Sequence, residues 1–145
     1  MDKLTRDKDR EALEEASFPE ICEGAIHPKA IEGLKLFNGR HYWEAHEALE
    51  AAWMEEEGTA RHLYKGILQA GVMYLQLERR NFIGAAKMYE RAKRWLAPWP
   101  NVCRGIQVGK LRGDIDAAIA AAGKLGPEEL EHFEPSFYKP VEYKI

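Results

Sequence analysis

The sequence contains little cysteine. Its only two cysteines, Cys22 and Cys103, are too few for a small secreted scaffold that several disulfides hold together. We expect both to be packed or idle thiols and not nucleophiles. This low cysteine content favours a reducing compartment, and we predict a cytoplasmic protein.

The sequence also lacks a long apolar run. Its most apolar stretch, residues 66–77, is interrupted by Gln69 and Gln76 and is shorter than the roughly 20 residues that a membrane-spanning helix needs. The first 15 residues are dense in charge and have no apolar centre, which is not the pattern of a signal peptide. We therefore expect no contact with a membrane.

Neither sign of charge dominates. Lysine and arginine total 21 and aspartate and glutamate total 24, so the net charge is −3. This excludes proteins that bulk positive charge holds to nucleic acid. The motifs GxGxxG, GxxxxGK, CxxC and GxSxG are absent, and we expect no cofactor. With 46% apolar residues in 145, the chain can bury the core of one domain.

Helical periodicity is the dominant pattern that is present, and no segment alternates with period two. It predicts an all-α, single-domain bundle of five or six helices. We expect helices at residues 4–16, 28–38, 41–56, 60–78, 81–96 and 114–124, with Asp114 as the N-cap of the last. The predicted organisation is an N-terminal helix and linker (1–27), a helical core (28–126) and an extended tail packed on the surface (127–145).

An internal repeat is visible when the sequence is shifted by 40 residues. The shift aligns Tyr42 with Phe82, Ala45 with Ala85, Leu49 with Tyr89, and Ala52 with Ala92. Small residues at such positions let helices approach closely. We predict two helical hairpins side by side that loosely resemble tetratricopeptide hairpins, although the usual period of that repeat is about 34 residues.

The richest segment for chemistry surrounds His46. On a helical wheel, His46 lies on the buried side and Glu50 lies at its edge, and the two are four residues apart. They can act as a general acid/base pair, as two metal ligands, or as a structural pair between helices. We expect no metal, because the zinc-protease pattern needs a second histidine where Glu50 stands, and the repeat copy offers Ala86 and Glu90.

A second polar stripe follows the helix at 60–78. Arg61, Lys65, Gln69 and Gln76 share one side of an otherwise apolar helix. This stripe faces either water or a partly buried polar cleft. Arg61 is a candidate to bind Glu47 or Glu50 in bidentate fashion.

Charge is divided unevenly along the chain. Residues 41–57 hold six acids and no lysine or arginine, whereas residues 79–94 hold six basic residues and one acid. The two helices are either complementary within one domain or exposed to solvent. In a third interpretation, the basic helix and the following Trp95 and Trp99 contact RNA or an acidic partner.

The segment FNGRHYWEAHEALEAAW, residues 37–53, resembles the signature of the domain-of-unknown-function 309 family. Further matches are Arg61, residues 66–69, Asn81 and residues 84–85. The chain departs from the family pattern at Lys65, Gln76 and Arg80, where glutamine, a nearby histidine and glycine are usual. The resemblance implies a small all-helical protein without an established activity. It also implies a shared polar cluster, formed by Glu44, His46, Glu47, Glu50, Trp53, Arg61 and Gln69.

These observations lead to a partner-binding or structural module as the first hypothesis. Its partner would be a protein or a small ligand, and a homodimer is one option. The alternative is a small hydrolase-like enzyme with His46 as general base, Glu50 orienting it and Arg61 holding an anionic substrate. A second alternative is RNA binding through residues 79–94. The sequence leaves catalysis open but favours a protein without it, and it disfavours nucleic acid as a partner.

Overall fold

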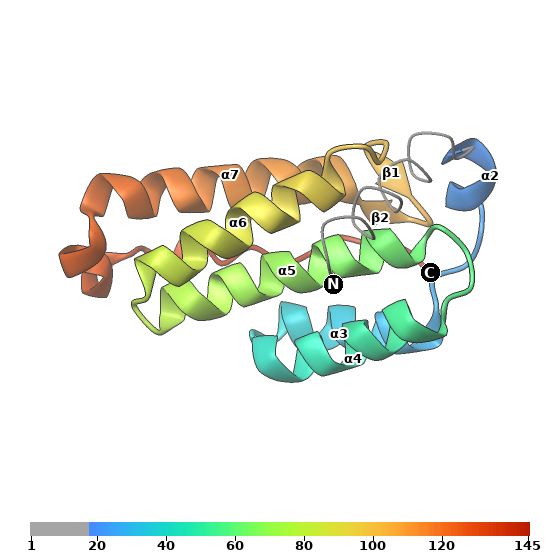
Figure 1. Cartoon of the computed structure of the whole chain (residues 1–145), viewed down its shortest axis with the longest axis horizontal. Helices are drawn as coiled ribbons and strands as arrows, with labels where there is room; N and C mark the ends of the chain where they lie inside the picture. The colour runs from blue at the N-terminus through green and yellow to red at the C-terminus, as the bar shows by residue number, and fades with distance from the viewer. Residues whose placement is uncertain (1–17) are drawn as a thin grey trace, which may run out of the picture.

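The structure is a computed structural model that describes residues 18–145 (Figure 1). It is an all-α bundle with one very small sheet, which confirms the predicted fold class. The elements are α2 (Phe18–Cys22), α3 (Pro28–Asn38), α4 (Tyr42–Glu55), α5 (Arg61–Glu78), α6 (Phe82–Leu96), β1 (Val102–Cys103), β2 (Ile106–Gln107), α7 (Val108–Leu125) and the 3-10 helices η1 (Pro127–His132) and η2 (Pro135–Phe137). The helix predicted at 4–16 lies outside the described residues.

Helix α5 is the central element. It packs against α4 on one side and α6 on the other, while α3 covers α4 and α7 covers α6 (Figure 1). Its sequence is apolar nearly all round, so that Leu63, Ile67 and Tyr74 are all fully buried. None of the described helices combines the length and the apolar character that crossing a membrane requires.

Helices α3 and α5 end in the same way. Each is followed by a residue in the left-handed conformation, Arg40 (φ 63°) after α3 and Arg80 (φ 59°) after α5. The next residue, His41 or Asn81, donates its backbone N–H over 2.9 Å to the carbonyl five residues earlier, which is a Schellman turn. The hairpins α3–α4 and α5–α6 therefore share one turn geometry. Gly39 has φ −86° and precedes the left-handed position.

The predicted resemblance to tetratricopeptide hairpins is not confirmed.

The last long helix also differs from prediction, because α7 begins at Val108 and not at Asp114. Asp114 lies inside α7, where its carboxylate accepts a 2.6 Å bond from Lys110 one turn earlier. The helix starts early because buried Val108 and Leu111 continue its apolar side back to the β1–β2 hairpin.

The two cysteines form a disulfide, so the prediction of separate thiols is wrong. Cys22 at the end of α2 is joined to Cys103 in β1, although 81 positions separate them. Two isolated cysteines form no recognisable framework, and only the folded chain brings α2 beside the hairpin. The bond removes the cysteine argument for a reducing compartment.

Residues 127–145 return along the bundle after η1 and η2. Leu130, Phe133 and Val141 are buried in the common core. Asn38 at the end of α3 holds the segment, since its side chain both donates to the Val141 carbonyl (2.9 Å) and accepts from the Val141 N–H (2.7 Å). The C-terminal segment thereby fixes the end of α3 where the first hairpin turns.

Candidate functional site: a polar and aromatic cluster on α4 and α5

The α4 side of the site consists of His46, Glu50 and Trp53. Their spacing of four and three residues places them on one side of the helix. Nδ1 of His46 lies 3.8 Å from a carboxylate oxygen of Glu50, which is within ion-pair range but too long for a hydrogen bond. The imidazole, 25% exposed, stacks on the indole of Trp43 with ring centroids 5.1 Å apart. His46 is thus held mainly by ring packing.

Lys65 connects α4 to α6 across α5. Its ammonium lies 5.1 Å from the ring centroid of Trp53 and 4.4 Å from that of Trp95. A cation between two indoles is attracted to the negative face of each ring. His62, one turn before Lys65 on α5, also stacks on Trp95, and their ring centroids are 5.0 Å apart. Three helices therefore meet at this lysine.

Three polar atoms of the site are buried without a hydrogen-bond partner in the described part of the chain. They are Nδ1 of His46, Nε1 of Trp53 and Oε1 of Gln69. An unsatisfied buried group costs about 1–3 kcal/mol of folding free energy. Gln76, two turns beyond Gln69, differs because its Oε1 accepts a 3.0 Å bond from Asn81. We call His46, Glu50, Trp53, Lys65 and Gln69 the polar cluster.

The other predicted site residues lie outside the polar cluster. Glu44 and Glu47 are exposed on α4, and within residues 18–145 neither pairs with a basic side chain. Arg61 is exposed at the start of α5 and, within the same residues, forms no ion pair with Glu47 or Glu50.

Lys65, His62 and Trp95 belong to the site but were not predicted as site residues. Lys65 stood in the predicted polar stripe of α5 but was not placed among the site residues. Helical spacing alone could have placed it one turn from Gln69. His62 and Trp95 carried no such signal, because their contact joins two helices and depends on how closely α5 and α6 pack.

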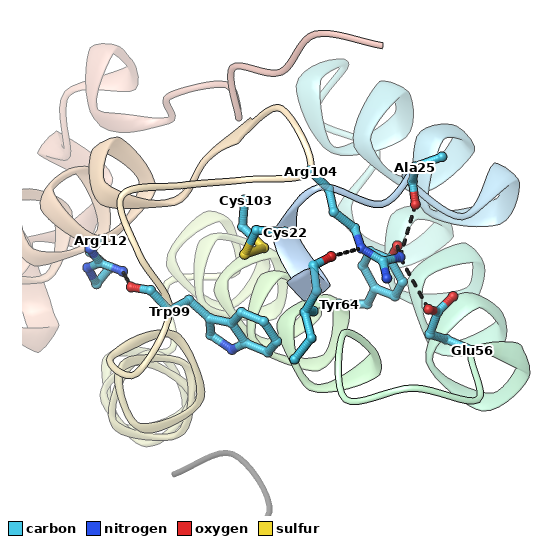
Figure 2. Close-up of a disulfide and its surroundings, with 9 residues drawn as sticks. Cys22, Ala25, Glu56, Tyr64, Trp99, Cys103, Arg104 and Arg112 are labelled. Atoms are coloured by element: carbon cyan, nitrogen blue, oxygen red, sulfur yellow. Dashed lines mark hydrogen bonds and ion pairs between the residues drawn. A yellow bond between two sulfur atoms is a disulfide. The ribbon is translucent and has the colours of Figure 1, made fainter. Parts of the chain in front are cut away.

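Arg104 forms a second polar centre beside the disulfide, which no motif in the sequence indicated (Figure 2). Its guanidinium donates to the carbonyls of Ile21 and Ala25 at 2.9 Å and to the Glu56 carboxylate and the Tyr64 hydroxyl at 3.2 Å. Only 12% of this side chain is exposed. These bonds from Nε and Nη1 join chain segments that are distant in sequence.

The acidic and basic helices lie on opposite sides of α5. Among the described residues no ion pair joins α4 to α6, so complementarity within one domain does not explain the charge division. Every lysine and arginine of α6 is exposed: Lys87, Arg91, Lys93 and Arg94. These side chains form a solvent-facing surface.

One group in the described part of the chain offers three metal-type ligands close together. It consists of Glu129, Glu131 and His132 on η1, and all three are exposed. Nε2 of His132 lies 3.4 Å from Glu129 and 3.5 Å from Glu131. Such contacts are ordinary for a charged surface turn. The group is remote in sequence from the polar cluster and contributes nothing to it.

Two comparisons with known proteins bear on this arrangement. Residues 30–88, from α3 into α6, match the family model Domain of unknown function (DUF309), which confirms the resemblance expected from the sequence. An "Uncharacterized protein" of Aquifex aeolicus (strain VF5) is 24% identical over 102 residues. The aligned part covers 70% of this chain but only 31% of that relative, so the chain spans about a third of the relative's length.

Proposed function

We propose that the part of this chain matching DUF309 is a partner-binding module and that the polar cluster is its binding site. One observation carries the proposal. His46, Trp53 and Gln69 come from two adjacent helices, and each holds a buried polar atom that the described fold does not satisfy. Because less than 1 Å² of each atom is exposed, a partner can supply the missing hydrogen bonds only once these side chains turn toward it.

The chemistry of these groups describes the partner. The indole N–H of Trp53 needs an acceptor, and the amide oxygen of Gln69 needs a donor. Lys65 adds positive charge between two rings. A protein segment or a small ligand that carries both a donor and an acceptor fits this set.

Replacing Gln69 with methionine tests whether the amide serves the fold. We expect Gln69→Met to raise the free energy of unfolding by about 1 kcal/mol, because it removes an unsatisfied buried oxygen. Gln76→Met is the matched control on the same helix. It should lower the free energy of unfolding by up to about 1 kcal/mol, since the bond from Asn81 is lost. Urea unfolding of both variants provides the measurement.

Equal destabilisation by the two substitutions would show that the amide oxygen of Gln69 has a hydrogen-bond partner within the chain, and this would contradict the proposal.

A thermal-shift screen with metals, nucleotides and phosphate esters tests the small-ligand form of the proposal. A compound that raises the unfolding temperature of the native chain should not raise that of the His46→Ala variant. Stabilisation that is the same in both proteins would place the ligand elsewhere.

The two alternatives receive less support from the structure. A hydrolase would need Arg61 beside the His46–Glu50 pair, and neither Glu47 nor Glu50 pairs with it in residues 18–145. RNA binding would need aromatic rings open to bases. Trp95 and Trp99 are only 3% and 2% exposed, so neither ring can stack on a base.

The cytoplasmic location expected from the sequence is a separate proposal. The disulfide weighs against it, because disulfides are rare in reducing compartments. Alkylation of thiols in intact cells tests the location. Reaction of Cys22 and Cys103 before any added reductant indicates a reducing compartment, and reaction only after reduction indicates an oxidising one.

A further inference from the structure

The outward side of α4 carries two large apolar side chains that the fold leaves open to solvent. Trp43 is 50% exposed and Met54 is 73% exposed. At about 100° and 1.5 Å per residue, they point within about 20° of each other and stand about 16 Å apart along the helix. The buried residues Ala45, Leu49 and Ala52 lie on the opposite side. Trp43 and Met54 therefore mark the ends of one line along the solvent-facing side of α4.

Two glutamates complete this line. We call Trp43, Glu47, Glu50 and Met54 the outer face of α4, and they follow one another at intervals of four, three and four residues. Two packed helices contact each other along a seam with this spacing. Helices α3 and α5 pack on other sides of α4 (Figure 1). Within residues 18–145, the outer face thus has the spacing of a helix-packing seam that no helix covers.

The charge of the outer face is negative and largely uncompensated. Within the described residues Glu47 forms no ion pair, and the one ion-pair contact of Glu50 is the 3.8 Å approach to His46. Residues 41–57 contain six acids and no lysine or arginine. A basic occupant would therefore be attracted to the outer face, and an acidic one would be repelled.

The fold fixes the orientation of Trp43 before any contact. Its indole stacks on the imidazole of His46, with ring centroids 5.1 Å apart and ring planes inclined by 8°. A side chain that is already held loses less conformational entropy when a partner covers it. Tryptophan and methionine are also enriched at protein interfaces, where tryptophan often contributes much of the binding energy.

We propose that the outer face of α4 binds a basic amphipathic helix of a partner protein. The partner helix places apolar side chains against Trp43 and Met54, and it places lysine or arginine against Glu47 and Glu50. Its contact side therefore reads apolar, basic, basic and apolar at intervals of four, three and four residues. The same glutamates would repel the phosphates of a nucleic acid or of an anionic membrane.

This inference does not rest on the polar cluster. The outer face shares only Glu50 with that cluster. Variants of Glu47 and Met54 therefore test the outer face separately.

A synthetic helical peptide provides the probe. The basic peptide, rich in alanine and glutamine, carries leucine, lysine, lysine and leucine at the intervals given above. One counterpart has glutamate in place of both lysines, and the other has alanine in place of both leucines. Calorimetric titration of the native full chain should show binding of the basic peptide that salt weakens. Each counterpart should bind at least about tenfold more weakly.

Two variants on the outer face have matched controls on α6. Glu47→Lys should weaken binding of the basic peptide and strengthen binding of its glutamate counterpart. Glu90→Lys, the same change at an exposed position of α6, should alter both far less. Met54→Ala should weaken binding of the basic peptide severalfold, whereas Ile83→Ala, at a side chain that is 67% exposed, should not. Circular dichroism verifies that each variant is folded.

Absence of binding to the basic peptide, equal binding of the three peptides, or equal effects of a variant and its control would each overturn the inference. Gln69→Met distinguishes the outer face from the polar cluster. Unchanged peptide binding in this variant would support the outer face, whereas loss of binding would place the peptide on the polar cluster and overturn the inference. The urea comparison of Gln69→Met with Gln76→Met can fail while the peptide still binds, so the two proposals are tested independently.

Discussion

Three arginines hold the left-handed backbone conformation that favours glycine: Arg40, Arg80 and Arg104. Two of them offset its cost through their side chains. Arg40 donates to Glu78 over 2.9 Å and lies over the ring of Tyr138, and Arg104 joins four protein groups beside the disulfide. Arg80 is exposed in the turn before α6. Its backbone strain is therefore the least compensated of the three.

Replacing Arg80 with glycine should stabilise the protein. Relief of the left-handed conformation is worth about 1–2 kcal/mol, and the greater freedom of glycine in the unfolded chain offsets about 0.4–1 kcal/mol of it. We expect a net gain of about 0.5–1 kcal/mol in the free energy of unfolding, measured by urea denaturation.

The neighbouring residue provides the control for that substitution. Arg79 is also exposed but has φ −83°, a conformation that any residue adopts. Arg79→Gly should therefore lower stability, because only the entropic cost remains. A loss of stability in Arg80→Gly as large as that in Arg79→Gly would contradict the strain argument.

At the scale of elements, local sequence signals account for α3 to α6. Pro28 begins α3 as expected, and apolar residues at helical spacing define the buried sides of α4 and α5. The same spacing placed His46 and Glu50 on neighbouring positions of one side of α4. Local signals could not define the start of α7 or the β1–β2 hairpin, because these depend on packing against residues distant in sequence.

The polar cluster follows the same division. Contacts within α4 could be predicted from spacing, such as the approach of His46 to Glu50. The position of Lys65 between Trp53 and Trp95 depends on the packing of three helices. The hydrogen bonds of Arg104 reach segments that are up to 83 residues away in the sequence. Helical periodicity cannot predict contacts of this kind.

Helices α4 and α6 begin with different caps, and this difference predicts different costs of substitution. The Asn81 side chain accepts a 3.0 Å bond from the Gly84 N–H, whereas His41 at the equivalent position makes no side-chain cap bond. We expect Asn81→Ala to lower the free energy of unfolding by about 1 kcal/mol and His41→Ala to change it much less. Asn81→Asp keeps the cap acceptor and should preserve most of the stability. Thermal and urea unfolding of the three variants provide the measurement. The capping explanation would be contradicted if His41→Ala lowered the free energy of unfolding more than Asn81→Ala.

At the scale of the whole molecule, the disulfide constrains the unfolded chain. Cys22 and Cys103 enclose most of the bundle, and a long closed loop loses considerable entropy in the unfolded state. We expect reduction, or the pair Cys22→Ser with Cys103→Ser, to lower the free energy of unfolding by about 2–4 kcal/mol. The urea midpoint measured with and without a dithiol reductant reports the change.

The double serine variant also serves as the control for that experiment. Its midpoint should not respond to the reductant. A native chain whose midpoint is the same in both conditions would show that the bond contributes nothing to stability. Loss of the reductant effect in the variant, together with its presence in the native chain, would assign the effect to this one bond.

Buried tyrosines make the whole fold sensitive to alkali. Burial raises the pKa of Tyr138 to about 12 and raises the pKa of Tyr42 further above its usual value of 10.0. Between pH 10 and these higher values, the unfolded chain loses tyrosine protons that the folded chain keeps. Stability should therefore be constant with respect to these groups below pH 10 and fall as the pH rises above it.

Urea midpoints measured at pH about 8 and about 11 check this expectation. Tyr138→Phe removes one titrating group and should reduce the fall between the two conditions. An equal fall in the native chain and in Tyr138→Phe would show that Tyr138 does not contribute to it.

The disulfide also determines how the chain would carry mechanical load. It joins residues that lie before α3 and after α6, so the four helices between them form a covalently closed ring. Force applied between Phe18 and Ile145 would pass through the two sulfur atoms and bypass the ring. The segment that matches DUF309 lies wholly inside this ring and would stay folded under tension that extends α7 and the C-terminal segment.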